Sequence, residues 1–394
     1  MGVVRRLTRV DACASPPDPH PNPPHKGEGA RRVCRGRIDS VVRLAIVGAV
    51  ALAGLGAANA QAQDILLSRA PDREQQILDG ARKEGQVVLY SAMIVNQALR
   101  PLADAFMKKY PFVKLTYWRG DTEEIVEKLS AEERANHLVA DVAEGTGVGE
   151  LAVGAGLTQP YYTPLVEQIP ERYRDPANRW TYTRISYFCI AYNTKLVPPA
   201  EVPKSYDDLL DPRWRGKLAW RTGTASGTPL FITTIRLARG EAAANDYFRK
   251  LAQQKMINFG SGSARTLVDR VIAAEFPIAL NIFAHHPLIS KAKGAPVDSQ
   301  LMNPVPSTAG TMVIPKGVRH PYAAMLLADF ILSQEGQQIL ANADYFPVRS
   351  DVAPKPALAS VIPQRAGVPE LFITPDQLNR YTASSQKIFE ELFQ

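Results

Sequence analysis

The sequence predicts an α/β protein built from two lobes. At 394 residues the chain is longer than one hydrophobic core usually organises, so two lobes are the expected division. Beyond residue 63, strand-like and helix-like segments alternate, and this order is typical of an open sheet with crossover helices. A hydrophobic content of 45% and a charged content of 22% are ordinary for a soluble globular protein.

The first part of this pattern has the order β-α-β-α. Apolar residues recur at helical spacing in its second segment, with Pro101 near the start. Asp121, followed three residues later by Glu124, forms a capping box that opens the next helix. Strands are expected at 86–90, 113–118 and 141–143, and helices at 96–110, 122–134 and 149–155.

The later part continues the alternation without a repeat at any fixed period. A second capping box joins Ser205 and Asp208, and Pro-rich loops precede the last helix. Strands are expected at 185–192, 217–220, 277–283 and 311–314, and helices at 229–239, 245–254, 263–274, 322–332, 336–341 and 377–392.

The N-terminal region has the pattern of a secretory signal peptide at 41–62. Arg43 precedes a continuous small and apolar stretch, 44–58, and two A-x-A sites follow, so cleavage is expected after Ala60 or Ala62. The apolar stretch is too short to span ~30 Å of hydrocarbon. Residues 1–40 contain a Pro-rich segment and fit no targeting pattern, so we interpret them as untranslated sequence upstream of the true start, or as disordered.

The positive charge of the chain is concentrated in this N-terminal region. Residues 1–62 contain nine Lys and Arg and four Asp and Glu; subtracting them from the totals of 46 and 39 leaves 37 and 35. Residues 63–394 therefore carry a net charge of only +2, and no nucleic-acid partner is predicted. Cys13 and Cys34 precede the cleavage site, and Cys189 lies in an apolar run, where a buried thiol is expected.

Several short stretches, taken in order, resemble the periplasmic solute-binding proteins of ABC importers, specifically the branch named for ferric-ion binding. They cover roughly 75–352. The matching stretches are VVLYSA (87–92), YNTKLVP (192–198), SYDDLLDPRWRGK (205–217), SGT (226–228), GSGS (260–263), HP (320–321) leading to SQEGQ (333–337), and FPVR (346–349).

The resemblance implies a type II periplasmic-binding fold with two hinge-crossing segments and a ligand held between the lobes. The crossings are expected near 184–187 and 307–311. Lobe I is then 64–186 plus 310–345, and lobe II is 187–309 plus 346–394. Closure is expected to be a hinge motion that ligand contacts stabilise.

Ligands of open α/β sheets bind beyond the carboxyl ends of strands, where helix N-termini present free N–H groups. Applying this rule to the predicted junctions, and adding Arg184 at a crossing, gives sixteen candidate ligand-binding residues. They are Ser91, Ala92, Arg119, Thr122, Glu123, Thr146, Arg184, Thr224, Ser226, Gly227, Thr228, Ser261, Ser263, Asn281, His285 and His286.

Some candidates have a purely structural alternative. Ser263 is equally suited to being an N-cap, and Asp121 and Glu123 could serve only a capping box. Arg184 could bind a substrate anion or pair with an acid of the other lobe.

The ligand class depends on where the sequence departs from the ferric-binding pattern. Phe283 and Ala284 fall where the resemblance places adjacent iron-binding tyrosines, and Met93 or Ile94 falls where it places a histidine. His285 and His286 could bind metal, but in an extended segment neighbouring side chains point to opposite sides. No metal site or cofactor is therefore assigned. The ligand is expected to be a small organic anion, a carboxylate or phosphonate, with ferric ion or an iron complex left open.

The predicted function is capture of a small ligand in the periplasm and its delivery to an inner-membrane ABC permease. The protein is expected to be a monomer. A sensory role, with presentation to a membrane receptor, is the alternative. The sequence contains no G-x-S-x-G, H-E-x-x-H, C-x-x-C or Walker A motif, and no enzymatic activity is predicted.

Overall fold

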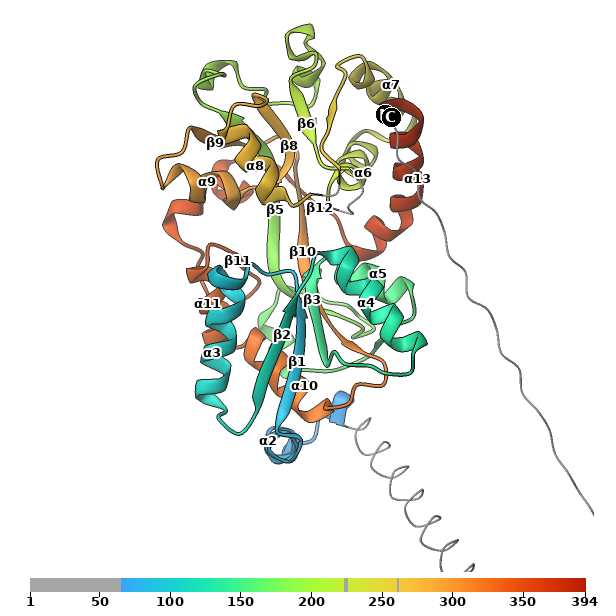
Figure 1. Cartoon of the computed structure of the whole chain (residues 1–394), viewed down its shortest axis with the longest axis vertical. Helices are drawn as coiled ribbons and strands as arrows, with labels where there is room; N and C mark the ends of the chain where they lie inside the picture. Colours follow the sequence, from blue (N-terminus) through green and yellow to red (C-terminus); the bar gives the residue numbers. More distant parts are fainter. Residues whose placement is uncertain (1–64, 223–225, 261) are drawn as a thin grey trace, which may run out of the picture. The chain divides into compact units, whose positions relative to one another are not determined.

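The structure is a computed structural model that describes residues 65–222, 226–260 and 262–394 (Figure 1). The predicted signal peptide, residues 1–40, Cys13, Cys34, Thr224 and Ser261 lie outside the described residues. None of the helices in the described ranges is long and apolar enough to cross a membrane. Cys189 is buried and carries a free thiol, as the sequence predicted, and burial raises its pKa.

One half of the sheet has parallel strands in the order β2-β1-β3, and β10 joins β3 in the antiparallel direction. The crossover helices confirm the predicted β-α-β-α order. The elements are α2 (Arg73–Glu84), β1 (Gln86–Ser91), α3 (Arg100–Lys109), β2 (Lys114–Arg119), α4 (Thr122–Arg134), β3 (Val142–Thr146), α5 (Val148–Gly154) and β4 (Thr158–Gln159), with α10 (Pro321–Leu332) and α11 (Gln334–Asn342) added from later in the chain.

The other half of the sheet has the order β5-β8-β6-β7, in which β6 pairs in parallel with β7 and β8. Helices follow the carboxyl ends of β6, β7 and β8 in this half. The elements are β6 (Leu218–Trp220), α6 (Thr228–Arg239), α7 (Glu241–Ala252), β7 (Ile257–Asn258), α8 (Ala264–Ile272), β8 (Ile278–Phe283), α9 (His285–Lys291), β9 (Val297–Gln300), α12 (Pro363–Ala366), β12 (Glu370–Phe372) and α13 (Pro375–Phe393). The short strand β11 (Phe346–Pro347) pairs with β5 at Arg184 and Ile185, next to α11.

Two long strands, β5 (Thr181–Asn193) and β10 (Val305–Pro315), run through both halves of the sheet. They pair with each other from Ser307 opposite Tyr187 to Gly310 opposite Arg184, and the register shifts after Gly310. The two predicted crossing segments therefore lie side by side in these strands. We keep the lobe ranges 64–186 with 310–345 and 187–309 with 346–394 as a proposal.

Aromatic packing fixes α13 to the second half of the sheet. Trp220 at the end of β6 is fully buried and contacts the rings of Phe231, Phe389 and Phe393 at centroid distances of 5.6, 6.2 and 4.8 Å. These residues belong to an apolar cluster that lies entirely in this half. The last turns of the C-terminal helix, which carry Phe389 and Phe393, are thus part of this core.

Two local predictions need correction. The helix expected over 96–110 begins as a π-helical turn at Val95–Leu99, and regular α-helix starts only at Arg100, since Pro101 lacks a backbone donor. His285 and His286 are not extended: they open α9, where Pro287 is tolerated within the first turn.

Candidate functional site

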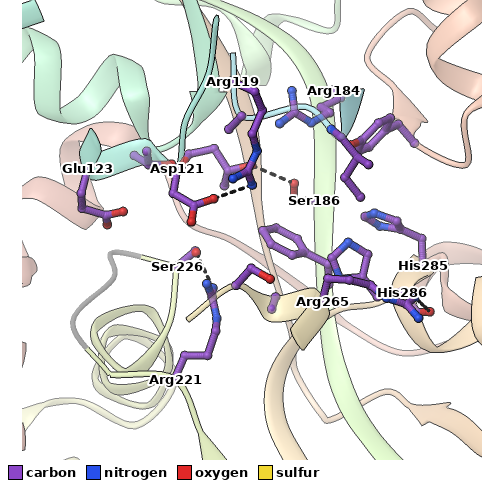
Figure 2. A pocket seen from close by; sticks show the side chains of 18 residues that line it. Arg119, Asp121, Glu123, Arg184, Ser186, Arg221, Ser226, Arg265, His285 and His286 are labelled. Carbon is purple, nitrogen blue, oxygen red and sulfur yellow. Dashed lines mark hydrogen bonds and ion pairs between the residues drawn. The ribbon is translucent and has the colours of Figure 1, made fainter. Parts of the chain in front are cut away.

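A cleft of about 730 Å³, counting the space at its open mouth, lies where loops of the two sheet halves face each other. Figure 2 shows its lining side chains pointing toward one another. The cleft is lined by Ala92, Ile94, Arg119, Asp121, Thr122, Glu123, Thr146, Arg184, Ser186, Arg221, Ser226, Ser263, Ala264, Arg265, Phe283, His285, His286 and Tyr345.

Helix N-termini converge on this cleft because several strands end there. Strand β2 leads into α4 through Asp121 and Thr122, β6 leads toward α6 through Arg221 and Ser226, and α8 begins just after Ser263. Each of these three helices presents unpaired backbone N–H groups and the positive end of its dipole at its start. The fold alone therefore makes the cleft favourable for an anion.

The first wall of the cleft is organised by Asp121. Its carboxylate accepts from the Arg119 guanidinium at 2.6 Å, and its backbone N–H donates to Glu124 at 2.8 Å in a capping box. Thr122 donates to the backbone carbonyl of Thr146 at 2.7 Å and ties α4 to β3. The suggestion that Glu123 serves the capping box is wrong, because Glu124 fills that role and Glu123 lines the cleft.

Arg184 lies buried at the base of the cleft and forms an ion pair with Glu144 of β3. This acid belongs to the same half of the sheet, so the alternative of a partner in the other lobe is wrong. Glu144 also accepts from the hydroxyls of Ser91 at 2.8 Å and Thr183 at 2.9 Å. Burial lowers the pKa of Arg184, and its guanidinium lies 5.0 Å from the ring centroid of Tyr345.

Arg221 is the most isolated cation of the cleft. Its side chain donates to the Ser226 hydroxyl at 2.7 Å, its Nε has no hydrogen-bond partner among the described residues, and only 6% of the residue is exposed. Burial lowers its pKa to about 10, and the charges of Glu123 and Asp121 across the cleft oppose this shift. The guanidinium therefore stays charged at neutral pH, and it makes no ion pair within the described ranges.

Arg265 stands on the first turn of α8 and completes the set of four lining arginines. Its guanidinium pairs with Asp269 at 2.8 Å and donates to the backbone carbonyl of His286 at 3.4 Å. Ser263, the residue before this helix, accepts from the Thr266 backbone N–H at 3.1 Å and also lines the cleft. Ser263 thus combines the N-cap role with a position in the cleft.

His285 and His286 form the floor of the cleft on the side of β8 (Figure 2). Their ring centroids are 4.5 Å apart, and the residues are 2% and 7% exposed. Neither ring nitrogen of His285, nor Nδ1 of His286, has a hydrogen-bond partner among the described residues. Burial lowers the pKa of His285 to about 3 and that of His286 well below its usual value, so both rings are neutral.

Not every predicted site residue reaches the cleft. Ser91 points away from it toward Glu144, Thr228 donates to the Arg221 carbonyl at 2.6 Å, and Asn281 donates to the carbonyls of Ser226 and Gly227 at 2.8 and 3.0 Å. Thr228 and Asn281, with Gly227, shape the loop that carries Ser226. The predicted residues that line the cleft are Ala92, Arg119, Thr122, Glu123, Thr146, Arg184, Ser226, Ser263, His285 and His286.

The structure also adds residues that sequence reasoning missed. Arg221 directly follows β6, and extending the strand-end rule by one position would have found it. Arg265 stands one residue inside α8, while Ser186 lies on β5 and shares a 3.4 Å hydrogen bond with Thr146. Tyr345 follows α11, and no local sequence pattern indicates its position.

The donor set does not match the tyrosine pair of ferric-ion capture. Phe283 lines the cleft and Ala284 is fully buried, so neither position offers an oxygen donor. Within the described ranges, no group of three or more His, Cys, Asp or Glu side chains is arranged to hold a metal ion. Four arginines in the lining add positive charge that disfavours a bare cation.

Comparison with known proteins places the chain in a family. Residues 140–369 match the family model of the bacterial extracellular solute-binding proteins. An uncharacterised protein of Haemophilus influenzae is 30% identical over 66% of this chain and 76% of its own length. The Fe(3+)-binding periplasmic protein of Serratia marcescens is 23% identical over 69% and 81%. A Salmonella typhi protein, provisionally named 2-aminoethylphosphonate-binding periplasmic protein, is 26% identical over 64% and 74%.

Solved structures confirm the predicted type II periplasmic-binding fold. The periplasmic binding protein AfuA of Actinobacillus pleuropneumoniae, with fructose-6-phosphate bound, matches with a TM-score of 0.66 at 24% identity, over 79% of this chain and 99% of that one. Iron-bound HitA of Pseudomonas aeruginosa matches with a TM-score of 0.66 at 21% identity, over 78% and 99%. The two-lobed fold, the cleft and the family match agree: the chain belongs to the bacterial extracellular solute-binding proteins that serve ABC importers.

Proposed function

We propose that this solute-binding protein captures a small organic phosphate or phosphonate in the periplasm and delivers it to an ABC permease. The solute is held in the cleft by the four arginines and the helix N-termini, and closure of the lobes buries it. Export through the signal peptide at 41–62 and action as a monomer are parts of this proposal. No catalytic activity is included in it.

The main support for the proposal is that Arg221 is a buried cation without an ion-pair partner among the described residues. A buried guanidinium without a counterion costs several kcal/mol. Among the described residues, the side chain of Arg221 has one hydrogen-bond partner, the Ser226 hydroxyl, and no ion-pair partner. A tetrahedral oxyanion would supply the missing charge and accept from the free Nε as well, since arginine suits multidentate recognition of phosphate. Relatives named for phosphonate binding, and a structural neighbour with a bound sugar phosphate, support this ligand class.

An iron complex is the ligand class that this proposal must exclude. Relatives include an Fe(3+)-binding protein, yet Phe283 and Ala284 supply no phenolate here. Isothermal calorimetry of the purified protein with fructose 6-phosphate, 2-aminoethylphosphonate, inorganic phosphate and ferric citrate separates these classes. We expect at least one phosphorus oxyanion to bind and ferric citrate not to bind.

Arg221→Gln tests the residue that carries the argument. The variant keeps hydrogen-bonding groups but removes the charge, so binding of the oxyanion is expected to weaken by about 100-fold, the effect of losing a charged hydrogen bond. Arg249→Gln is the control, because Arg249 is exposed and pairs with Asp246 outside the cleft. Tight ferric citrate binding that Arg221→Gln leaves intact would overturn the proposal.

A further inference from the structure

We propose that His285 and His286 recognise hydroxyl groups on the body of the solute, so that the solute is a polyhydroxylated phosphate ester. This inference rests on the proposed function, because it assumes that the arginines hold the charged end of the same molecule. It adds a second recognition element, and it distinguishes a hydroxylated ester from a short aminoalkyl phosphonate or free phosphate.

The histidine rings largely lack hydrogen-bond partners among the described residues. Both residues are more than nine-tenths buried, and three of their four ring nitrogens make no hydrogen bond among the described residues. Buried polar groups in folded proteins nearly always have partners, since leaving one unsatisfied is unfavourable. Because the rings line the cleft, a bound solute can supply the missing partners.

The protonation state of the two rings decides which partners suit them. The imidazoles are neutral, as burial and the charges of Arg184 and Arg265 oppose their protonation. A neutral imidazole has one donor and one acceptor nitrogen. A hydroxyl group also donates and accepts, so it can satisfy either nitrogen, whereas a fully ionised phosphate could only accept. The pair is therefore suited to neutral hydroxyl groups.

The histidine pair lies beside the arginines in the lining of the cleft. Arg265 donates to the backbone carbonyl of His286, so one cationic group stands directly beside the two rings. The Phe283 ring centroid lies 5.3 Å from that of His286, and the Tyr345 ring centroid lies 5.3 Å from that of His285. The arginine, the histidines and the two aromatic rings thus offer a charged, a polar and an apolar surface next to one another. These surfaces suit the phosphate, the hydroxyl groups and the C–H groups of a sugar phosphate.

A metal ion is a poorer partner for the same rings. The described residues contain no third His, Cys, Asp or Glu that groups with them. Arg184 and Arg265 already act on His285 with positive charge, and a divalent cation would meet the same repulsion. Hydroxyl groups meet no such penalty.

The test is calorimetry with fructose 6-phosphate and inorganic phosphate as paired probes, using the protein processed from the full chain. The wild-type protein is expected to bind fructose 6-phosphate at least about 30-fold more tightly than inorganic phosphate. His285→Leu and His286→Leu each remove the ring nitrogens at similar volume. Combined, they should weaken fructose 6-phosphate binding by about 100-fold and leave inorganic phosphate within about 3-fold.

Two further variants keep the test interpretable. His285→Gln retains a donor and an acceptor and should recover part of the lost affinity, while His137→Leu, at an exposed histidine outside the cleft, should change neither probe. Thermal unfolding without ligand supplies a second readout. The Leu variants should melt no lower than the wild type, since an unsatisfied polar group is replaced by an apolar one.

The outcomes separate the two proposals. Equal wild-type affinity for both probes, or equal loss of both in the Leu variants, overturns the hydroxyl-recognition inference alone. If the wild-type protein binds no phosphorus oxyanion, the proposed function is overturned, and this inference is overturned with it. A lower melting temperature of the Leu variants without ligand would show that the rings have a structural role, and would also overturn the inference.

Discussion

Arg221 and Ser226 are joined by a 2.7 Å hydrogen bond across the loop that enters α6. The arginine donates and the serine hydroxyl accepts, so the guanidinium is held toward the cleft before any solute arrives. Asn281 fixes the same loop from β8 through the carbonyls of Ser226 and Gly227. The cationic group is thus preorganised by neutral polar contacts, which leave its charge available to an anion.

Ser226→Ala is expected to weaken oxyanion binding by about 3–10-fold, because the Arg221 side chain loses the contact that orients it. The effect should be smaller than that of Arg221→Gln, in which the charge itself is lost. Calorimetry with the best-binding phosphorus oxyanion measures both. Ser384→Ala is a matched control, as Ser384 accepts from Arg236 at 2.6 Å on the exposed side of α6. Equal losses in the two serine variants would contradict this role.

Glu144→Ala should destabilise the fold, since it leaves Arg184 as a buried charge without its partner. The free energy of unfolding is expected to fall by about 3–5 kcal/mol. Urea denaturation measures this loss. The double variant Glu144→Ala with Arg184→Met should recover part of the stability, because no unpaired charge remains. Asp246→Ala, which breaks an exposed pair, should leave the midpoint unchanged. A double variant less stable than Glu144→Ala would contradict this account.

Much of the fold could be predicted because its signals are local. The helix at Thr122–Arg134 was located to the residue, since the capping acid Asp121 and the apolar spacing identify its start and its buried face. The extent of β10 was underestimated, as it spans Val305–Pro315 and not only 311–314. Its first residues pair with β5 at the predicted hinge, and pairing between segments so far apart in the chain cannot be predicted from a local sequence pattern.

The site was only partly predictable because strand ends do not fix where a side chain points. Ser91 and Asn281 both stand at or near the ends of strands, yet both turn to protein partners and away from the cleft. Asn281 has a left-handed backbone with φ of 55°, and this places its amide against two carbonyls. Tyr345 reaches the cleft only because the chain folds back after α11, a tertiary effect that no sequence window contains.

Acid should destabilise the protein through His285. Its folded pKa is about 3, held there by burial and by the charges of Arg184 and Arg265, with His286 beside it, whereas an unfolded histidine titrates near 6.5. Below the unfolded value, the unfolded chain binds a proton that the folded chain does not. Stability is therefore fully present above about pH 6.5 and is lost as the pH falls toward 3, by up to about 1.4 kcal/mol per pH unit.

His285→Leu isolates this contribution. Glu84 and Glu150 have pKa values raised by burial to about 7, so they favour the folded state as the pH falls and oppose the histidine effect. Urea denaturation at pH 7, 6, 5 and 4 measures the free energy of unfolding of the wild type and the variant. In the difference between the two values, the contributions of Glu84 and Glu150 cancel, because both proteins contain them. The advantage of the variant should grow steadily from pH 6.5 to 4. A constant difference over this range would mean that His285 titrates normally.

Gly310→Ala should impair the hinge. A Cβ at this position would lie 2.8 Å from Nη1 of Arg184 and 3.0 Å from Oε1 of Glu144, closer than side-chain atoms normally approach. The added methyl group must displace the buried ion pair at the point where β5 and β10 pair and their register shifts. We expect solute affinity to fall by about 10-fold, along with a lower melting temperature. Ala309→Gly, one residue earlier in the same strand, adds no atom near the pair and should keep its affinity. Calorimetry measures the solute affinity of both variants. Unchanged affinity in Gly310→Ala would show that the ion pair can shift without affecting the cleft.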